Sequence, residues 1–235
     1  METTDAMQSM AASTALPAAS DYGNKADYYF SNARREIEPL LPPSSARALE
    51  VGCGRGGTMQ WLRHTGRVRD AWGIELFEPA AKIARAHFAD VQVGDAEALV
   101  ETAWPGQQFD LVLCLDVLEH LVDPWRCADR LAQRLAPGGK LIASLPNVRC
   151  LHTLMPLLLR GEWRYTEDGL LDRTHLRFFT RGSAIEMLCG QRLQFERCIE
   201  LIRPGTRLHT LDRLTFGLLR DLTTWQYLIC VSKGT

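Results

Sequence analysis

A glycine-rich segment with an acidic residue in front of it gives the first chemical signal in this 235-residue chain. Gly52, Gly54 and Gly57 fit the pattern G-x-G-x-x-G after an apolar run, a spacing that lets the backbone pass close to a bound ligand. Glu50 stands two residues before the first glycine. A carboxylate there would repel a pyrophosphate and attract an ammonium group. The pattern therefore favours a cationic ligand, and a glycine-rich turn that binds nothing is the alternative.

Two further acidic residues close the next two apolar runs. Glu75 ends the second run, where a carboxylate can accept hydrogen bonds from both hydroxyls of a ribose. Asp95 ends the third run and can accept a hydrogen bond from the amine of an adenine. S-adenosylmethionine carries an ammonium group, a ribose and an adenine but no phosphate. We therefore predict S-adenosylmethionine as the cofactor; an NAD-dependent dehydrogenase conflicts with Glu50.

The chain alternates between short apolar runs and stretches of helical period, and these elements must position the glycine loop and the acidic residues. Runs of this kind, separated by amphipathic segments, are typical of βαβ units and a parallel sheet with helices on both faces. The predicted strands are 46–54, 71–76, 91–95, 109–117, 140–147, 194–202 and 225–233. Two strands late in the chain suggest an antiparallel finish. The acidic residues then lie together, because parallel strands end at one edge of a sheet.

Five segments at these predicted strand ends follow one another at fitting spacing. They are ALEVGCGRGG, GIEL, VGDAEAL, FDLVLCLDVLEHLVDP and LAPGGKLIASLPN. Together they resemble the motifs of the class I S-adenosylmethionine-dependent methyltransferases. The resemblance covers about residues 46 to 233. It implies a Rossmann-like seven-stranded α/β sheet of order 3-2-1-4-5-7-6, with the last strand antiparallel and a cap inserted after strand 5.

The resemblance also implies which residues hold the cofactor. They are Glu50, Gly52, Cys53 and Gly54 in the glycine loop, Glu75 and Leu76 at the ribose, Asp95 and Ala96 at the adenine, and Leu115 at the methionine portion. The upstream segment DYYFSNARREI is similar to one that many relatives fold over the cofactor. Its Tyr29 and either Arg34 or Arg35, with Arg35 preferred, would meet the cofactor's carboxylate. A solvated helix face explains the two arginines equally well.

Two histidines are candidates for removing a proton from the acceptor. Methyl transfer from a sulfonium is an in-line displacement, so much of the enzyme's task is to align the acceptor, and a hydroxyl acceptor also needs a base. His120 follows the fourth predicted strand and is the first candidate; His175 is the second. Asp172 could orient His175 or hold an acceptor hydroxyl. Each of these residues could instead lock a loop.

The segment 148–180 is predicted to cap the acceptor side, and 203–222 to be a helical insertion between the last two strands. Asn147, Trp163, Tyr165, Asp172 and Arg177 are the acceptor-binding candidates, although aromatic residues at this spacing are often core residues. From residue 149 to residue 220 there are 12 Arg, no Lys and 8 acidic residues, a charge of +4, against −5 for residues 1–148. We therefore expect an anionic acceptor.

The composition of the chain disfavours several classes of protein. A net charge of −1 disfavours a general nucleic-acid binder. Seven cysteines without a C-x-x-C pair indicate neither a disulfide framework nor a zinc ribbon, which favours the cytoplasm. We expect residues 1–24 to be a flexible tail without signal-peptide features and 25–235 to be one domain without a membrane span. The six histidines contain no H-x-x-x-H pair, so no metal is predicted.

These observations predict a metal-independent O-methyltransferase that uses S-adenosylmethionine and acts on a small hydroxylated acceptor such as a sugar, a nucleotide-linked sugar or another metabolite. The stretch 144–180 resembles bacterial glycan and natural-product O-methyltransferases, and the EHL-x-DP pattern resembles the ubiquinone O-methyltransferases. That stretch also resembles a methyltransferase-like protein that partners an acyltransferase. A regulatory partner that binds the cofactor without turnover therefore stays open, as does a homodimer.

Overall fold

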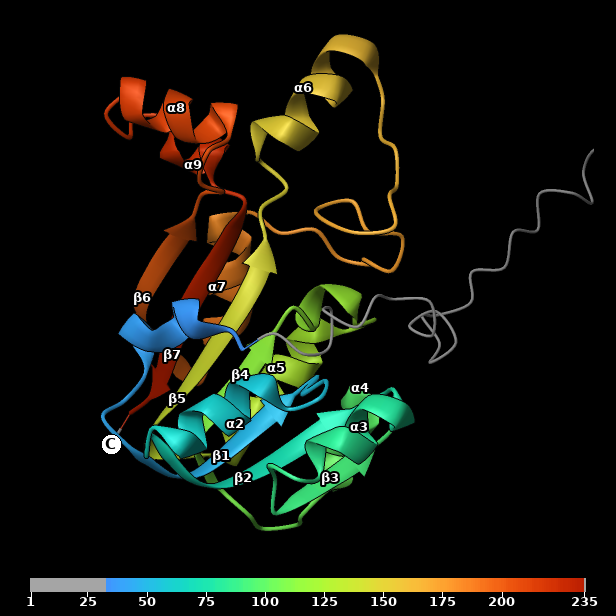
Figure 1. The fold of residues 1–235 in the computed structure, drawn as a ribbon, viewed down its shortest axis with the longest axis vertical. Coiled ribbons are helices and arrows are strands. Elements are labelled where there is room, and N and C mark those ends of the chain that lie inside the picture. The colour runs from blue at the N-terminus through green and yellow to red at the C-terminus, as the bar shows by residue number, and fades with distance from the viewer. Residues whose placement is uncertain (1–32, 235) are drawn as a thin grey trace, which may run out of the picture.

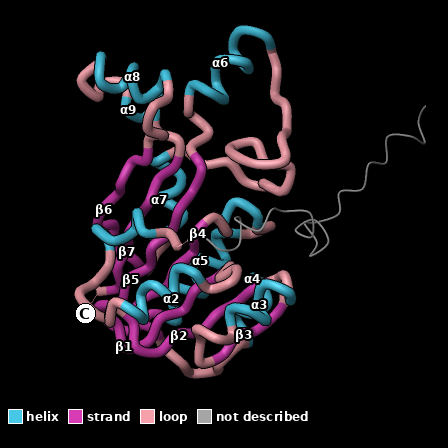
Figure 2. The backbone as a smooth tube through the Cα atoms, viewed as in Figure 1, coloured by secondary structure: helices cyan, strands magenta, loops and turns pink. Residues whose placement is uncertain are grey.

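The computed structural model describes residues 33–234, which form a seven-stranded sheet with helices on both faces (Figure 1, Figure 2). The strands are β1 (Ser45–Val51), β2 (Val68–Glu75), β3 (Asp90–Val93), β4 (Phe109–Leu115), β5 (Leu135–Pro146), β6 (Leu193–Leu201) and β7 (Gln226–Lys233). Their order is β3-β2-β1-β4-β5-β7-β6. Strands β1 to β5 pair in parallel, and β7 runs antiparallel to β5 and β6. The predicted sheet order and antiparallel last strand are confirmed.

The helices form a layer on each face of the sheet. They are α2 (Gly57–His64), α3 (Glu78–Ala84), α4 (Ala96–Thr102), α5 (Pro124–Arg134) and α7 (Arg181–Cys189), with the 3-10 helices η2 (Arg35–Leu40) and η3 (Leu118–His120). One buried apolar cluster joins the sheet to α5 and α7, and a second joins it to η2, α2 and α3. The central strand β4 is apolar along most of its length because both of its faces are covered.

The fifth strand begins earlier than the sequence predicts. β5 starts at Leu135, directly after α5; Leu135 pairs with β4, and residues 136–139 form an irregularity before regular pairing resumes at Lys140. The pairing with β4 shifts register there: Phe109 lies opposite Leu135, whereas Leu111 lies opposite Lys140. A Cβ atom on Gly139 would lie 2.9 Å from the carbonyl oxygen of Ala136, which explains a glycine at this irregularity.

Two segments extend beyond one end of the sheet (Figure 1). The first leaves after β5, forms α6 (Leu151–Arg160), and returns where Asn147 and Phe179 make an isolated parallel bridge. The second joins β6 to β7 and contains α8 (Arg207–Leu214) and α9 (Arg220–Thr223). Helix α7 then begins with Thr180 as its N-cap, and the side chains of Thr180 and Ser183 cap each other's backbone N–H groups. Within residues 33–234, no helix is both long enough and apolar enough to cross a bilayer.

Candidate active site

The glycine loop after β1 is held close to the loop after β4. Gly52 and Gly54 have φ of +68° and +54°, a backbone region that favours glycine. A Cβ atom on Gly52 would lie 2.4 Å from Cγ2 of Val117, so a side chain there would collide. The Gly52 N–H donates to the carbonyl oxygen of Ile74 at 2.8 Å, which ties the loop to β2. The exposed backbone of this loop can therefore approach a ligand closely.

The Glu75 carboxylate braces the same loop. It accepts hydrogen bonds from the Gly54 N–H at 2.7 Å and from the Phe77 N–H at 2.9 Å. Burial raises the pKa of Glu75, while these backbone hydrogen bonds act in the opposite direction. Because each carboxylate oxygen can accept more than one hydrogen bond, both retain capacity for ribose hydroxyls.

Glu50 is the buried carboxylate that the sequence singles out. Its side chain sits at the end of β1, the residue is 4% exposed, and no described residue gives a hydrogen bond to Oε2. Burial, followed by the nearby charge of Glu75, raises the pKa of Glu50 to about 8. A buried carboxylate oxygen without a partner is costly, and an ammonium group would supply both a donor and an opposite charge. The residues present therefore fit a cationic cofactor.

The remaining cofactor candidates lie at neighbouring strand ends, because β1 to β4 are parallel. Asp95 is exposed and accepts from the Glu97 N–H at 2.9 Å as the N-cap of α4, which begins at Ala96. Cys53 is buried, Leu76 follows β2, and Leu115 ends β4. Burial raises the pKa of the Cys53 thiol. Tyr29 lies outside the described residues.

Arg34, rather than Arg35, faces the strand ends. The Arg34 guanidinium pairs with the carboxylates of Asp116 and Glu36, and its Nη2 donates to Oε1 of Gln226 at 3.0 Å. Arg35 is exposed, with its guanidinium carbon 6.0 Å from the ring centroid of Trp61. The structure thus does not bring Arg35 to the other candidates, because Arg34 precedes η2 and Arg35 begins it, and the two side chains point in different directions.

Asp116 holds the Arg34 guanidinium in place, and the sequence analysis did not identify it as a site residue. It follows β4 directly and has φ of +59°, which is unusual for a residue other than glycine. Its Oδ1 accepts from Oγ of Ser144 at 2.8 Å, and the Ser144 hydroxyl in turn accepts from the Asp116 N–H at 2.8 Å. An acid at a fourth strand end, after Glu50, Glu75 and Asp95, was the available signal.

The structure brings His120 and His175 together although they are 55 positions apart. Their ring centroids are 4.7 Å apart, with an angle of 75° between the ring planes. Nδ1 of His120 lies 3.1 Å from the Thr174 carbonyl oxygen, and Nδ1 of His175 lies 3.2 Å from the Leu170 carbonyl oxygen. Burial, followed by the neighbouring His175, lowers the pKa of His120 to about 4, so its ring is neutral near pH 7.

Glu119 completes this cluster and was also missed. The residue is 1% exposed, and no hydrogen bond from the described part of the chain reaches either side-chain oxygen. Burial and the charge of Asp116 raise its pKa well above the usual range. Its backbone carbonyl accepts from the N–H groups of Leu176 at 2.8 Å and Arg177 at 3.0 Å. A buried acid beside a histidine in an otherwise apolar segment was the available signal.

Two of the predicted acceptor-binding residues serve the loops around them. The Asn147 amide donates to the carbonyl oxygens of Asp221 at 2.7 Å and Thr224 at 3.0 Å. Asp172 is buried, and its Oδ1 accepts from the backbone N–H and the hydroxyl of Thr174 at 2.9 and 2.8 Å. Both side chains therefore hold loops in place, the alternative that the sequence left open for Asp172.

The other three predicted acceptor-binding residues lie along the segment that returns from α6. The ring centroids of Trp163 and Phe178 are 5.2 Å apart in an edge-to-face arrangement, and Tyr165 is 47% exposed beside them. Arg177 donates from Nε to the Val122 carbonyl oxygen at 3.0 Å. These side chains offer aromatic surface and positive charge on one stretch of chain.

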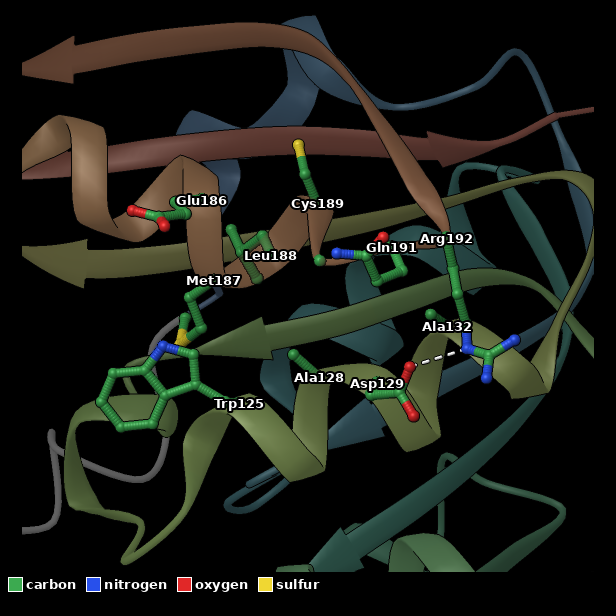
Figure 3. Close-up of a pocket in the computed structure, with 11 residues that line it drawn as sticks. Trp125, Ala128, Asp129, Ala132, Glu186, Met187, Leu188, Cys189, Gln191 and Arg192 are labelled. Atoms are coloured by element: carbon green, nitrogen blue, oxygen red, sulfur yellow. Dashed lines mark hydrogen bonds and ion pairs between the residues drawn. The ribbon is translucent and has the colours of Figure 1, made fainter.

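A hollow between α5 and α7 is separate from this site (Figure 3). It has a volume of about 250 Å³ and is lined by helix side chains such as Trp125 and Met187. The ion pair between Asp129 and Arg192, with Oδ1 and Nε 2.7 Å apart, crosses its rim. None of the residues predicted to bind cofactor or acceptor lines it, so it is not part of the candidate active site.

Comparison with known proteins identifies a matching family and relatives with similar sequences. A family model described as a methyltransferase domain matches residues 25–201. A ubiquinone biosynthesis O-methyltransferase of Xylella fastidiosa is 34% identical over 131 residues, which are 54% of this chain and 52% of that protein. A protein of the same name from Azoarcus sp. is 28% identical over 184 residues, 72% of this chain and 73% of its own length. The chain thus spans about half the length of the first relative.

Solved structures share the fold. An S-adenosylmethionine-dependent methyltransferase from Archaeoglobus fulgidus aligns with a TM-score of 0.61 at 18% identity, covering 85% of this chain and 91% of that one. The N-methyltransferase NodS from Bradyrhizobium japonicum, in complex with S-adenosyl-L-homocysteine, aligns with a TM-score of 0.58 at 14% identity, covering 92% and 96%.

Proposed function

Because the chain belongs to the class I S-adenosylmethionine-dependent methyltransferases, we propose that it transfers the methyl group of that cofactor to a hydroxyl of a small acceptor. The observation that carries this proposal is the buried, unpartnered Oε2 of Glu50, which no described residue satisfies, beside a glycine loop that excludes side chains. The names of the Xylella and Azoarcus relatives, both O-methyltransferases, support a hydroxyl as the acceptor group.

The cofactor supplies a methyl group already activated on a sulfonium. Glu50 would pair with the ammonium of the cofactor, Glu75 would accept from the ribose hydroxyls, and Asp95 would accept from the adenine amine. Leu115 and the glycine loop would contribute backbone contacts. We assign the cofactor's carboxylate to Arg34, with Tyr29 as a second contact, because Arg34 and not Arg35 turns toward the strand ends.

We place the acceptor hydroxyl at the His120–His175 pair, next to the loop that carries Asp116. The acceptor oxygen forms a bond to the methyl carbon while the carbon–sulfur bond breaks, and the bonding electrons stay on sulfur. The hydroxyl proton passes to a ring nitrogen of His120, the first candidate base, or of His175, the second. The burial of His175 and the half-buried position of His120 support this placement, because a site shielded from water aligns the acceptor and limits hydrolysis.

Residues 148–180 would cover the acceptor, and the 12 arginines between residues 149 and 220 favour an anionic one. Trp163, Tyr165 and Arg177 are the residues we propose to contact it. A sugar, a nucleotide-linked sugar or another small metabolite has this chemistry, and the net charge of −1 argues against a nucleic acid. Seven cysteines, all free, support a cytoplasmic location.

The test is an acceptor screen with S-adenosylmethionine labelled in its methyl group. We expect label to enter an anionic hydroxylated compound, and we expect His120→Ala to lower turnover at least about 100-fold while cofactor affinity changes little. His64→Ala, on the exposed end of α2, is the control. Cofactor binding without transfer to any acceptor, together with a stable complex with another enzyme, would instead support the regulatory partner.

A further inference from the structure

The loop 116–123 that follows β4 carries His120 but has little regular structure of its own. Its helix, η3, is three residues long, and the backbone is extended again at Leu121. Two hydrogen bonds lie inside the loop: the N–H of His120 donates to the carbonyl oxygen of Val117 at 3.0 Å, and the N–H of Leu121 donates to that of Leu118 at 3.3 Å. A placement accurate enough for proton transfer therefore depends on contacts from outside the loop.

Glu97, in the first turn of α4, binds the far end of this loop through both of its carboxylate oxygens. Oε2 accepts from the N–H of Val122 at 3.0 Å, and Oε1 accepts from the N–H of Asp123 at 2.8 Å. Hydrogen bonds from backbone N–H groups to a carboxylate are stronger than those between neutral groups. Two of them to neighbouring peptide groups fix the direction of the chain as well as its distance from α4. Asp123 then starts α5 as its N-cap by accepting from the Arg126 N–H at 3.0 Å.

Arg177, on the segment that returns from α6, holds the other side of the same peptide unit. Its Nε donates to the carbonyl oxygen of Val122 at 3.0 Å, and its backbone N–H donates to the carbonyl oxygen of Glu119 at 3.0 Å. The ring of His120 is held by the same segment, with Nδ1 3.1 Å from the carbonyl oxygen of Thr174. The loop that carries His120 is thus clamped between α4 on the cofactor side and the segment 148–180 on the acceptor side.

The backbone of Glu97 is tied to the end of the site where we place the adenine. Oδ1 of Asp95 accepts from the Glu97 N–H at 2.9 Å, so both residues belong to the first turn of α4. The residue before Asp95, Gly94, donates its N–H to the backbone carbonyl oxygen of Glu75 at 3.0 Å. A ligand that holds Asp95 in place therefore also holds the turn from which the Glu97 side chain reaches the loop 116–123.

We propose that Glu97 is a positioning residue: it places the loop 116–123, and with it His120, and it links this placement to occupancy of the cofactor site. The inference rests on the proposed function, because it takes Asp95 as the adenine contact and His120 as the first candidate base. Coupling of this kind is reciprocal, so a cofactor that orders the turn of α4 favours acceptor binding, and a bound acceptor favours the cofactor. The sequence did not indicate Glu97, because the N–H groups that it binds lie 25 and 26 positions further along the chain.

Amide hydrogen exchange of the full chain tests the placement without an acceptor. The exchange rates of the Val122 and Asp123 amides are measured by NMR with and without S-adenosyl-L-homocysteine. In the unaltered protein we expect both amides to be protected and the ligand to slow their exchange by a further factor of about three or more. Glu97→Ala should accelerate their exchange at least about tenfold and abolish the response to the ligand. Glu101→Ala is the matched control: it lies one turn further along α4, its carboxylate pairs with Arg126 at 2.7 Å, and both amides should keep their protection.

The amides of the buried strand β4 distinguish positioning from a general effect on stability. Exchange at Val122 and Asp123 that is unchanged in Glu97→Ala would overturn the inference. An equal acceleration throughout β4 would overturn it too, because Glu97 would then only stabilise the fold. If the unaltered protein binds S-adenosyl-L-homocysteine without any change at the two amides, the link to the cofactor is refuted.

Kinetics with an acceptor identified by the screen give the second test. Glu97→Ala should lower kcat at least about tenfold while cofactor affinity changes less than about twofold, because it moves the base and not the cofactor. Glu97→Gln keeps one accepting oxygen and should recover part of kcat. An unchanged kcat in Glu97→Ala would overturn the positioning role. Amides that lose protection in Glu97→Ala, in a protein that methylates no acceptor, would leave the placement of the loop standing and refute the proposed function alone.

Discussion

Binding of S-adenosylmethionine should expel a proton from Glu50. With a pKa of about 8, this carboxyl is roughly nine-tenths protonated at pH 7 in the free protein. An ammonium group against Oε2 favours the ionised form and brings the pKa back toward its ordinary range. We therefore expect a net release of nearly one proton per cofactor at pH 7. The net release falls at higher pH, because less Glu50 is protonated there and because the amine of the cofactor, with an ordinary pKa of about 7.8, takes up a proton as it binds.

Calorimetry in two buffers of different ionisation enthalpy, such as phosphate and Tris, measures this release at each pH. The observed binding enthalpy changes with the buffer in proportion to the number of protons released. Glu50→Gln keeps the shape of the side chain but cannot ionise, so the dependence should disappear while affinity falls. Glu38→Gln, at an exposed position of η2, is the matched control and should keep the dependence. A binding enthalpy that is the same in both buffers at pH 7 would refute the reasoning.

The raised pKa of Glu50 also predicts how the stability of the fold depends on pH. The pKa of Glu50 is higher in the folded protein than in the unfolded chain, so folding retains a proton that the unfolded chain releases. Its contribution is fully present below the unfolded pKa of about 4.5 and is lost as pH rises through the folded pKa of about 8. The loss is on the order of 5 kcal/mol for this buried group. Urea unfolding of the cofactor-free protein measures it, and Glu50→Gln should flatten the curve.

Three more substitutions test particular contacts. Gly52→Ala should reduce cofactor affinity, measured by calorimetry, at least about tenfold. Gly66→Ala is the control: its φ of +69° is nearly identical but the space around its Cβ position is open, so it should only destabilise the fold. Equal cofactor affinities of the two variants would refute the close approach of the loop to the cofactor. Asn147→Ala should lower the free energy of unfolding in urea by about 3 kcal/mol, because it leaves two buried carbonyl groups without their hydrogen-bond donor. A variant of unchanged stability with weakened acceptor binding would instead support the predicted role of Asn147 in acceptor binding. Arg177→Ala should raise the KM for an anionic acceptor about tenfold without changing cofactor affinity. An unaltered KM would show that Arg177 does not contact the acceptor.

The gathering of acidic residues at one edge of the sheet could be predicted from the sequence because its signals are local. Glu50, Glu75 and Asp95 each end an apolar run, and parallel strands bring such ends to one edge without further information. The sequence could not predict that Arg34, and not Arg35, turns toward the strand ends, because the two neighbouring arginines differ only in the direction of their side chains. The early start of β5 was hidden because its Pro-Gly-Gly segment is typical of a turn.

The acceptor side could be predicted less well because its contacts are long-range. His120 and His175 were considered separately, and the sequence does not show that a backbone carbonyl orients each ring. Nor does it show that the Glu119 carboxylate lies near both rings. Asn147 was predicted to bind the acceptor, but its amide is taken up by carbonyl groups of residues 221 and 224, far along the chain. Such pairings depend on the complete fold.

The bridge between Asn147 and Phe179 bears on how this protein can diversify. The chain leaves the sheet and returns to it at one point, so the intervening segment is a closed loop whose length the sheet does not dictate. Doubling such a loop costs only about 0.6 kcal/mol in closure entropy. Longer or shorter segments around α6 should be tolerated, provided that residues 174–177 keep their backbone contacts with Glu119 and His120. Recombination at this junction is thus an economical route to new acceptors, in evolution and in the laboratory.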